Sequence, residues 1–180
     1  MTIASEELVV LVDDHGQAVG TAPKALVHHR ATPLHLGFSC YLFDSAGQVL
    51  LTRRALSKQT WPGTWSNSFC GHPLPNETLI AAVQRCGERE LGVPIEQPEC
   101  VLPTFRYRAV ATDGTVENEI CPVFCATTES PIRPAADEVM DWRWVAWADL
   151  RTAAALAWPI SPWAAAQIPL LEAAAGLGPQ

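Results

Sequence analysis

A single amphipathic helix between two groups of strand-like runs is the feature that most restricts how this chain can fold. The helix is predicted to begin at Asn76-Glu77 and to end at Gly92. Its apolar positions recur at helical spacing: Ile80, Val83, Gly87 and Leu91. A helix with one apolar face buries that face against another element, so the fold must supply a surface that covers it.

Strand-like runs lie on both sides of this helix. They are predicted at residues 8–12, 34–43, 49–53, 100–110, 116–126 and 141–147. Turn signals at residues 44–47 and 112–114 join two pairs of them, and two short alanine-rich helices are predicted to close the chain. Strands and helices interleave, so we expect one domain over residues 1–180, of the α/β (α+β) class, with a mixed sheet covered by helices.

Charge and composition exclude several classes of function. Lysine and arginine total 12 against 19 aspartates and glutamates, a formal net charge of -7, which argues against nucleic acid as a partner. No apolar run reaches 18 residues, so we expect no membrane span. The six cysteines include no C-x-x-C pair, and the charges at Glu6 and Glu7 lead us to expect no signal peptide, so we expect free thiols and a cytoplasmic protein.

Histidines and glutamates form the first candidate site. Glu117 and Glu119 lie two apart in a predicted strand, so their side chains share a face. Two carboxylates on one face are costly without a cation or a proton between them, although a solvated edge strand is the alternative explanation. His28, His35 and His72 form no local motif, and each alone is more often structural. Together the five side chains would suit manganese, magnesium or zinc.

Cationic side chains gather in two places on this acidic chain. Arg53, Arg54 and Lys58 precede a run that contains Cys70 and His72, and Lys24 precedes His28. Such local density suits a small polyphosphate ligand, whereas scattered surface charges are the alternative.

The predicted helix adds one further carboxylate. Glu90 falls on or beside the apolar face, where it is either a rim residue or a buried group that needs a metal or a proton.

Several motifs in one order resemble type I isopentenyl-diphosphate isomerase, a family of the Nudix superfamily. The motifs are Asn67-Ser68-Phe69-Cys70-Gly71-His72-Pro73, Glu90-Leu91-Gly92-Val93, Phe105-Arg106-Tyr107-Arg108, Glu117-Asn118-Glu119 and Ser161-Pro162-Trp163. The resemblance covers residues 8–165. It implies a Nudix-type α/β/α sandwich with an N-terminal extension, a Nudix-like core over about residues 33–165, and a monomer that interconverts isopentenyl and dimethylallyl diphosphate for isoprenoid synthesis.

The resemblance also implies a role for each matching residue. Cys70 and Glu119 are expected to handle the proton, with help from Tyr107. One divalent ion is expected on His28, His35, His72, Glu117 and Glu119, and a second, magnesium, on Glu90 and the substrate diphosphate. The expected diphosphate ligands are Lys24, Arg54 and Lys58, whereas Trp163 is expected to face the developing carbocation, and a loop with Trp61 and Trp65 to close the pocket.

One position departs from the family pattern. A diphosphate-binding arginine expected in the middle of the helix is replaced by Cys86, and Arg85 or Arg89 is left to substitute for it. The hydrolase motif of the superfamily is incomplete as well, because Cys86 and Arg89 stand where two of its acids belong. A Nudix diphosphate hydrolase and a non-catalytic metal- or ligand-binding domain are the alternative functions, and neither explains Cys70 together with Glu119.

Overall fold

The computed structural model describes residues 7–156 and 160–175. Its larger sheet has the strand order β12-β5-β4-β11-β8. The bounds of these strands are β4 Phe38–Phe43, β5 Val49–Arg54, β8 Glu99–Leu102, β11 Val123–Thr127 and β12 Val139–Val145. Two short strands join it at its centre: β6 (Trp65–Ser66) pairs with β5, and β7 (Phe69–Gly71) pairs with β4.

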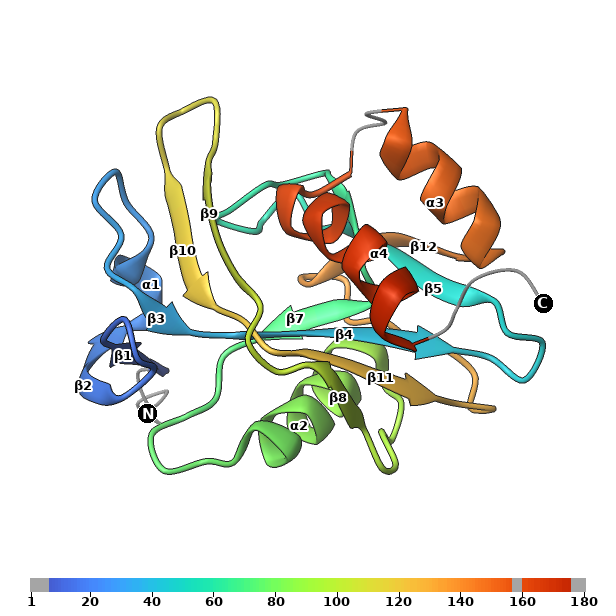
Figure 1. Ribbon diagram of the computed structural model, residues 1–180, viewed down its shortest axis with the longest axis horizontal. Coiled ribbons are helices and arrows are strands. Elements are labelled where there is room, and N and C mark those ends of the chain that lie inside the picture. The colour runs from blue at the N-terminus through green and yellow to red at the C-terminus, as the bar shows by residue number, and fades with distance from the viewer. Residues whose placement is uncertain (1–6, 157–159, 176–180) are drawn as a thin grey trace.

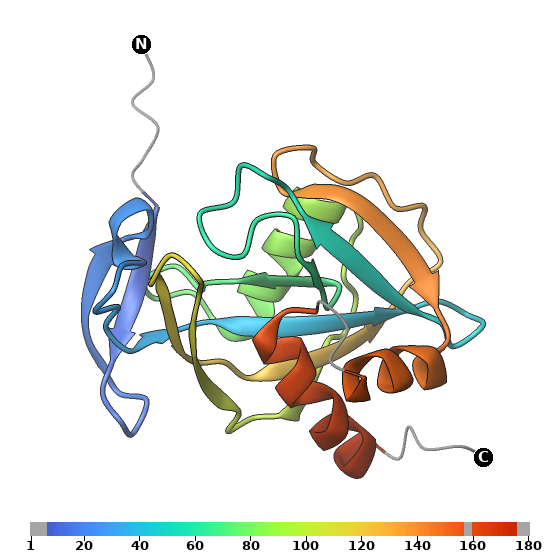
Figure 2. The same ribbon diagram turned by 90° about the horizontal axis from the view of Figure 1, so that it is seen from above.

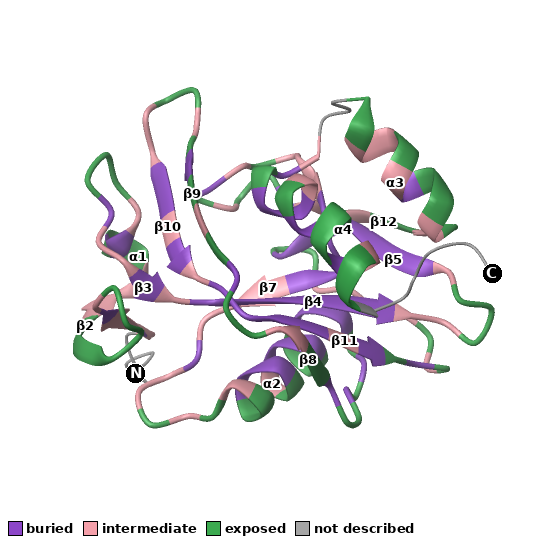
Figure 3. Ribbon diagram, viewed as in Figure 1, coloured by how far each residue is buried: buried purple, intermediate pink, exposed green. Residues whose placement is uncertain are grey.

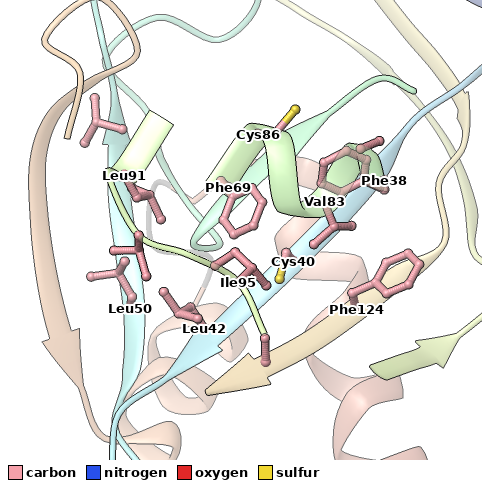
Figure 4. Packing of buried hydrophobic residues seen from close by; sticks show 14 residues of the cluster. Phe38, Cys40, Leu42, Leu50, Phe69, Val83, Cys86, Leu91, Ile95 and Phe124 are labelled. Carbon is pink, nitrogen blue, oxygen red and sulfur yellow. The ribbon is translucent and has the colours of Figure 1, made fainter. Parts of the chain in front are cut away.

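Helices cover both faces of this sheet. The helix α2 (Leu79–Leu91) lies on one face, and α3 (Trp147–Ala155) and α4 (Pro162–Ala175) lie on the other (Figures 1 and 2). The central strand β4 explains this layering, because its successive side chains point to opposite faces. Phe38, Cys40 and Leu42 pack in the cluster under α2 (Figure 4), whereas Tyr41 packs in the cluster under α3 and α4. A sheet of mixed direction with helices on both faces confirms the predicted α/β class.

A smaller sheet of five strands stands beside the first, in the order β2-β1-β3-β10-β9. Its strands are β1 Leu8–Val12, β2 Ala18–Pro23, β3 His35–Leu36, β9 Arg106–Val110 and β10 Val116–Ile120. The N-terminal segment contributes β1, β2 and the short helix α1 (Lys24–Val27), and β1 joins the sheet by pairing with β3. Burial is high along β4, at the centre of the larger sheet, and along β10, which lies between β3 and β9 in the smaller sheet (Figure 3).

Three predicted long strands are wrong in the same way. The runs at 34–43, 100–110 and 116–126 each divide into two strands, one in each sheet. Pro103 and Pro122 lie at two of the divisions, where their missing N–H cannot continue a ladder. At the third, Gly37 passes the Glu119 carboxylate so closely that an added Cβ would lie 2.4 Å from Oε2. The chain therefore crosses between sheets at these residues.

The predicted helix is confirmed as α2, although it begins later than expected. Thr78 caps its first turn by accepting a hydrogen bond from the Ala81 N–H, and Gly92 ends it in the left-handed conformation at φ 65°. The two closing helices are confirmed as α3 and α4. The sequence did not predict β2 or α1. All six cysteines, which lie within the described residues, are free, and no described helix is long and apolar enough to span a bilayer.

Candidate metal centre and active-site cavity

A cavity of about 600 Å³ lies between the smaller sheet, α2 and the loop after β5. Most of the candidate residues from sequence line it, although they come from seven separate helices and strands and from the loops that follow three of them. They are Lys24, His28, Arg54, Lys58, Cys70, His72, Glu90, Tyr107, Glu117, Glu119 and Trp163. The fold thus brings the two candidate proton-handling groups, Cys70 and Glu119, to one cavity.

Strand β10 positions the Glu119 carboxylate. Its register places Glu119 opposite His35 of β3 on one side and opposite Tyr107 of β9 on the other. Residues paired across neighbouring strands point to the same face, so imidazole, carboxylate and phenol stand in a row. Glu117 projects to this face two residues earlier, opposite the small side chain of Ala109.

Three imidazoles surround Glu119. Its Oε1 lies 3.0 Å from Nε2 of His72 and 3.4 Å from Nε2 of His35. One ligand atom from each of His28, His35, His72 and Glu119 lies within 4.8 Å of every other. Glu117 adjoins this cluster, with its Oε2 3.1 Å from Nε2 of His28. The five predicted ligands therefore meet at one place.

The chemistry of the cluster fits a divalent ion. Nδ1 of His35 donates a hydrogen bond to the Pro33 carbonyl at 2.9 Å. In the neutral ring the other nitrogen, Nε2, then has no proton and can only accept. It nevertheless faces another acceptor, the Glu119 carboxylate. Among the described residues, Nε2 of His28 and of His35 and Oε2 of Glu117 are buried without hydrogen-bond partners. Buried acceptors that face one another are costly unless a cation lies between them.

The closeness of the imidazoles to Glu119 also changes the pKa values in the cluster. Burial alone would raise the pKa of Glu119, but the imidazoles of His35 and His72 beside it hold the pKa well below its usual value. Burial lowers the pKa of His72. For His35 burial acts in the same direction, yet the interaction with Glu119 outweighs it and raises the pKa. The carboxylate thus stays ionised, as a ligand requires.

Replacement of His72 by alanine is expected to weaken divalent-ion binding at least about tenfold and to shift activity to higher metal concentrations, because one donor is lost. The measurement is the metal content and the metal titration of activity in the purified variant. His15→Ala is the matched control, since this histidine is exposed in the turn after β1. Unchanged metal content in His72→Ala would make His72 a structural residue.

The Cys70 thiol lies on β7 beside two polar side chains. It donates to Asn67 Oδ1 at 3.2 Å, and the Ser39 hydroxyl lies 3.4 Å from its sulfur. Burial raises the pKa of Cys70 to about 11, so the thiol holds its proton at neutral pH. Gly71 next to it leaves room for tight packing, because an added Cβ would lie 2.6 Å from the sulfur of Cys86.

Aromatic side chains form another part of the cavity wall. Trp163 is 2% exposed, and its ring contacts Tyr107 and Trp61 at centroid distances of 5.7 and 5.5 Å. The Arg54 guanidinium stacks on this ring, 5.3 Å from its centroid. Neither Trp61 nor Trp65 lines the cavity, and Trp65 lies under Arg143, so the part of this loop in closing the pocket stays a prediction.

The cationic rim is paired with carboxylates that the sequence did not reveal. Lys24 binds Glu7 at 3.1 Å, and Lys58 binds Glu138. Arg89 contacts both of these carboxylates, so it joins the two pairs into one chain of alternating charge. No local pattern marks Glu7 or Glu138, because their partners are distant in sequence.

Glu90 faces the cavity from α2 next to this rim. It is 8% exposed, and burial raises its pKa to about 7 against the attraction of Lys58. A carboxyl group so placed gains from a cation beside it.

Arg85 does not line the cavity, so the prediction that it binds the diphosphate lacks a structural basis. Its guanidinium makes two hydrogen bonds of 2.8 Å to Glu77 and one of 3.0 Å to the His72 carbonyl. Arg89 is the helix arginine that reaches the rim, through Glu138. Cys86 is 3% exposed and packs beneath Gly71.

The chain is similar to known proteins at two levels. The NUDIX domain family matches residues 33–168. The isopentenyl-diphosphate Delta-isomerase of Mycolicibacterium vanbaalenii is 62% identical over 172 residues, which cover 96% of this chain and 94% of the relative. The isomerase of Clavibacter sepedonicus is 55% identical over 166 residues, covering 92% of this chain and 87% of the relative.

Crystal structures of DR0079 from Deinococcus radiodurans and of a MutT protein from Methanosarcina mazei share the fold, with TM-scores of 0.71 and 0.65. Each is 18% identical, and the alignments cover 91% and 78% of this chain and 98% and 94% of theirs.

Proposed function

The chain belongs to the type I isopentenyl-diphosphate Delta-isomerases of the Nudix superfamily and interconverts isopentenyl and dimethylallyl diphosphate, and on this premise we propose that Cys70 and Glu119 exchange the protons of the reaction. One observation carries the proposal: both side chains line a single cavity, and the metal cluster is built around Glu119. Tyr107, paired with Glu119 across the strands, assists it.

The reaction requires a proton donor, a proton acceptor and a cavity without water. A proton added to the unactivated alkene gives a tertiary carbocation, and loss of a proton from the neighbouring methylene completes the shift of the double bond. Cys70 and Glu119 reach the substrate from different strands, β7 and β10, so one protonates the alkene while the other accepts the second proton. Water would trap the cation as an alcohol, so the walls must exclude it.

Trp163 is proposed to stabilise the positive charge. An indole face attracts a cation by roughly 2 kcal/mol when desolvated, and it cannot add to the carbocation as water would. Trp163 is buried and lines the cavity, and Trp61 packs against it in a T-shaped arrangement. The side chain thus supplies an electron-rich surface at a fixed place.

His28, His35, His72, Glu117 and Glu119 are proposed to hold one divalent ion, which is manganese, magnesium or zinc. Imidazole and carboxylate donors suit ions of intermediate hardness. When bound, the ion changes the proton affinity of the Glu119 carboxyl group and fixes its position. Magnesium that accompanies the diphosphate is proposed to bind Glu90, whose buried carboxyl group faces the same cavity.

Lys24, Arg54 and Lys58 are proposed to bind the diphosphate, far from the reacting carbons. Before substrate binds, Glu7 and Glu138 neutralise the two lysines. Arg89 holds both carboxylates, so each remains paired when its lysine turns to the diphosphate. Arg89 therefore compensates indirectly for the arginine that Cys86 replaces.

Lys58→Met is expected to raise the KM for isopentenyl diphosphate about 30-fold with little change in kcat, because a lost charged hydrogen bond to the diphosphate is worth about 2 kcal/mol in both ground and transition states. Steady-state kinetics measure both constants. Arg143→Met is the matched control, since it removes one positive charge from a side chain that is 70% exposed and lies outside the cavity. An unchanged KM in Lys58→Met would remove Lys58 from the diphosphate site.

Diphosphate hydrolysis finds no support in this site. A thiol and an arginine stand where the hydrolase motif has acids, and Cys86 is buried while Arg89 is bound to Glu138. A magnesium cluster with fewer carboxylates activates water poorly. We further propose that the protein acts as a monomer in the cytoplasm, where its six thiols remain reduced.

A further inference from the structure

The side chain of Asn67 is completely buried in the turn between β6 and β7. Its Nδ2 donates to the carbonyls of Cys40 and Phe69 at 3.0 and 2.8 Å. These two acceptors fix which way the amide points, because only the nitrogen end can donate to them. The orientation of Oδ1 follows from them.

Three donors converge on this oxygen. Oδ1 accepts hydrogen bonds from the Ser66 hydroxyl at 2.8 Å, from the Trp163 indole N–H at 3.0 Å and from the Cys70 thiol at 3.2 Å. Ser66 completes the network, since its hydroxyl also accepts from the same indole at 3.0 Å. Every member except Cys70 is at most 3% exposed, so water does not compete for these bonds.

We propose that Asn67 is a positioning residue that fixes the distance and the orientation between the side chains of Cys70 and Trp163 in the cavity wall. Cys70 lies on β7 and Trp163 on α4, so without a shared partner their separation would depend on packing alone. Asn67 does not line the cavity, so it acts through these two side chains and not on the substrate. The inference rests on the roles proposed above for Cys70 and Trp163.

A fixed separation matters for this reaction. The thiol must meet one end of the alkene while the indole lies beside the carbon that becomes positive. A displacement of about 1 Å in such a pair can cost roughly 100-fold in rate. Substrate affinity depends instead on the diphosphate ligands, which Asn67 does not touch.

Asn67→Ala tests the proposal, with Ser68→Ala as the matched control. Ser68 is the next residue and equally buried, but within residues 7–156 and 160–175 its hydroxyl bonds only to the backbone of Leu42 and Leu50. We expect Asn67→Ala to lower kcat about 100-fold, with KM within about threefold of the parent and metal content unchanged. Ser68→Ala is expected to lose stability but to keep kcat within about threefold.

A second readout separates this proposal from the role of Cys70. The rate of Cys70 alkylation by iodoacetamide, measured on the isolated peptide and referred to the exposed Cys100, is expected to change at least about threefold in Asn67→Ala and not in Ser68→Ala. An unchanged alkylation rate with an unchanged kcat would overturn the positioning role of Asn67. A changed alkylation rate with an unchanged kcat would instead overturn the role of Cys70, and the proposal with it.

Ser66→Ala keeps the proposal testable if Asn67→Ala does not fold. It removes one donor to Oδ1 and one acceptor of the indole N–H, while leaving Asn67 and its backbone bonds in place. A fall in kcat of about fivefold at constant KM is expected, since the remaining bonds hold the network less firmly. A kcat equal to that of the parent would contradict the proposal.

Discussion

Cys70→Ala is expected to lose isomerisation by about 1,000-fold or more while the protein stays folded and keeps its metal. The thiol is one of two groups proposed to transfer a proton, and removal of such a group costs up to about 10,000-fold. The metal is retained because the ligand cluster consists of imidazoles and carboxylates. Conversion of isopentenyl diphosphate and metal content are measured on the same preparation.

Cys100→Ala is the matched control for this prediction. Cys100 is exposed on β8 of the larger sheet and does not line the cavity, so its loss is expected to leave kcat unchanged. Isomerisation by Cys70→Ala within about tenfold of the parent would show that another group handles the proton.

Glu119→Gln is expected to abolish isomerisation to a similar extent and also to weaken metal binding. Glutamine keeps the shape of the side chain but has no charge for the ion and no oxygen that accepts a proton at neutral pH. His35 and His72 would also lose the carboxylate that lies between them. Activity and metal content are again measured together, over a range of metal concentrations.

Glu117→Gln separates the two roles that Glu119 combines. Glu117 lies two residues away on the same face of β10 and contacts His28, but we assign it no proton transfer. Excess metal is therefore expected to restore much of the activity of Glu117→Gln and almost none of that of Glu119→Gln. Equal restoration of both variants would reduce Glu119 to a metal ligand.

Local patterns in the sequence predicted the elements better than their division between sheets. The helix that ends at Gly92 and the first strand, β1, follow from spacing and turn residues. The long runs read as continuous because strand-forming residues stand on both sides of each break, although Pro103 and Pro122 mark two of the breaks. Gly37 gives no such signal in the sequence. A glycine is required there because Glu119, which comes from a distant strand, approaches it closely.

The candidate site depended on the resemblance more than on spacing. His28, His35 and His72 share no local motif, and only the pairing of β3 with β10 brings His35 beside Glu119. Arg85 was a reasonable candidate from its place on the helix, but the direction of its side chain is set by Glu77. Contacts between residues that are distant in the sequence leave no periodic pattern in it.

Hydrogen exchange with solvent tests the central claim most directly. The protein is incubated with isopentenyl diphosphate and magnesium or manganese in deuterated water, with a metal-free sample as its control, and deuterium is followed in substrate and product. We expect deuterium to enter both isomers with the intact protein. We expect almost none with Cys70→Ala, with Glu119→Gln or without metal. Deuterated dimethylallyl diphosphate formed at the parent rate by either variant would contradict proton exchange between Cys70 and Glu119.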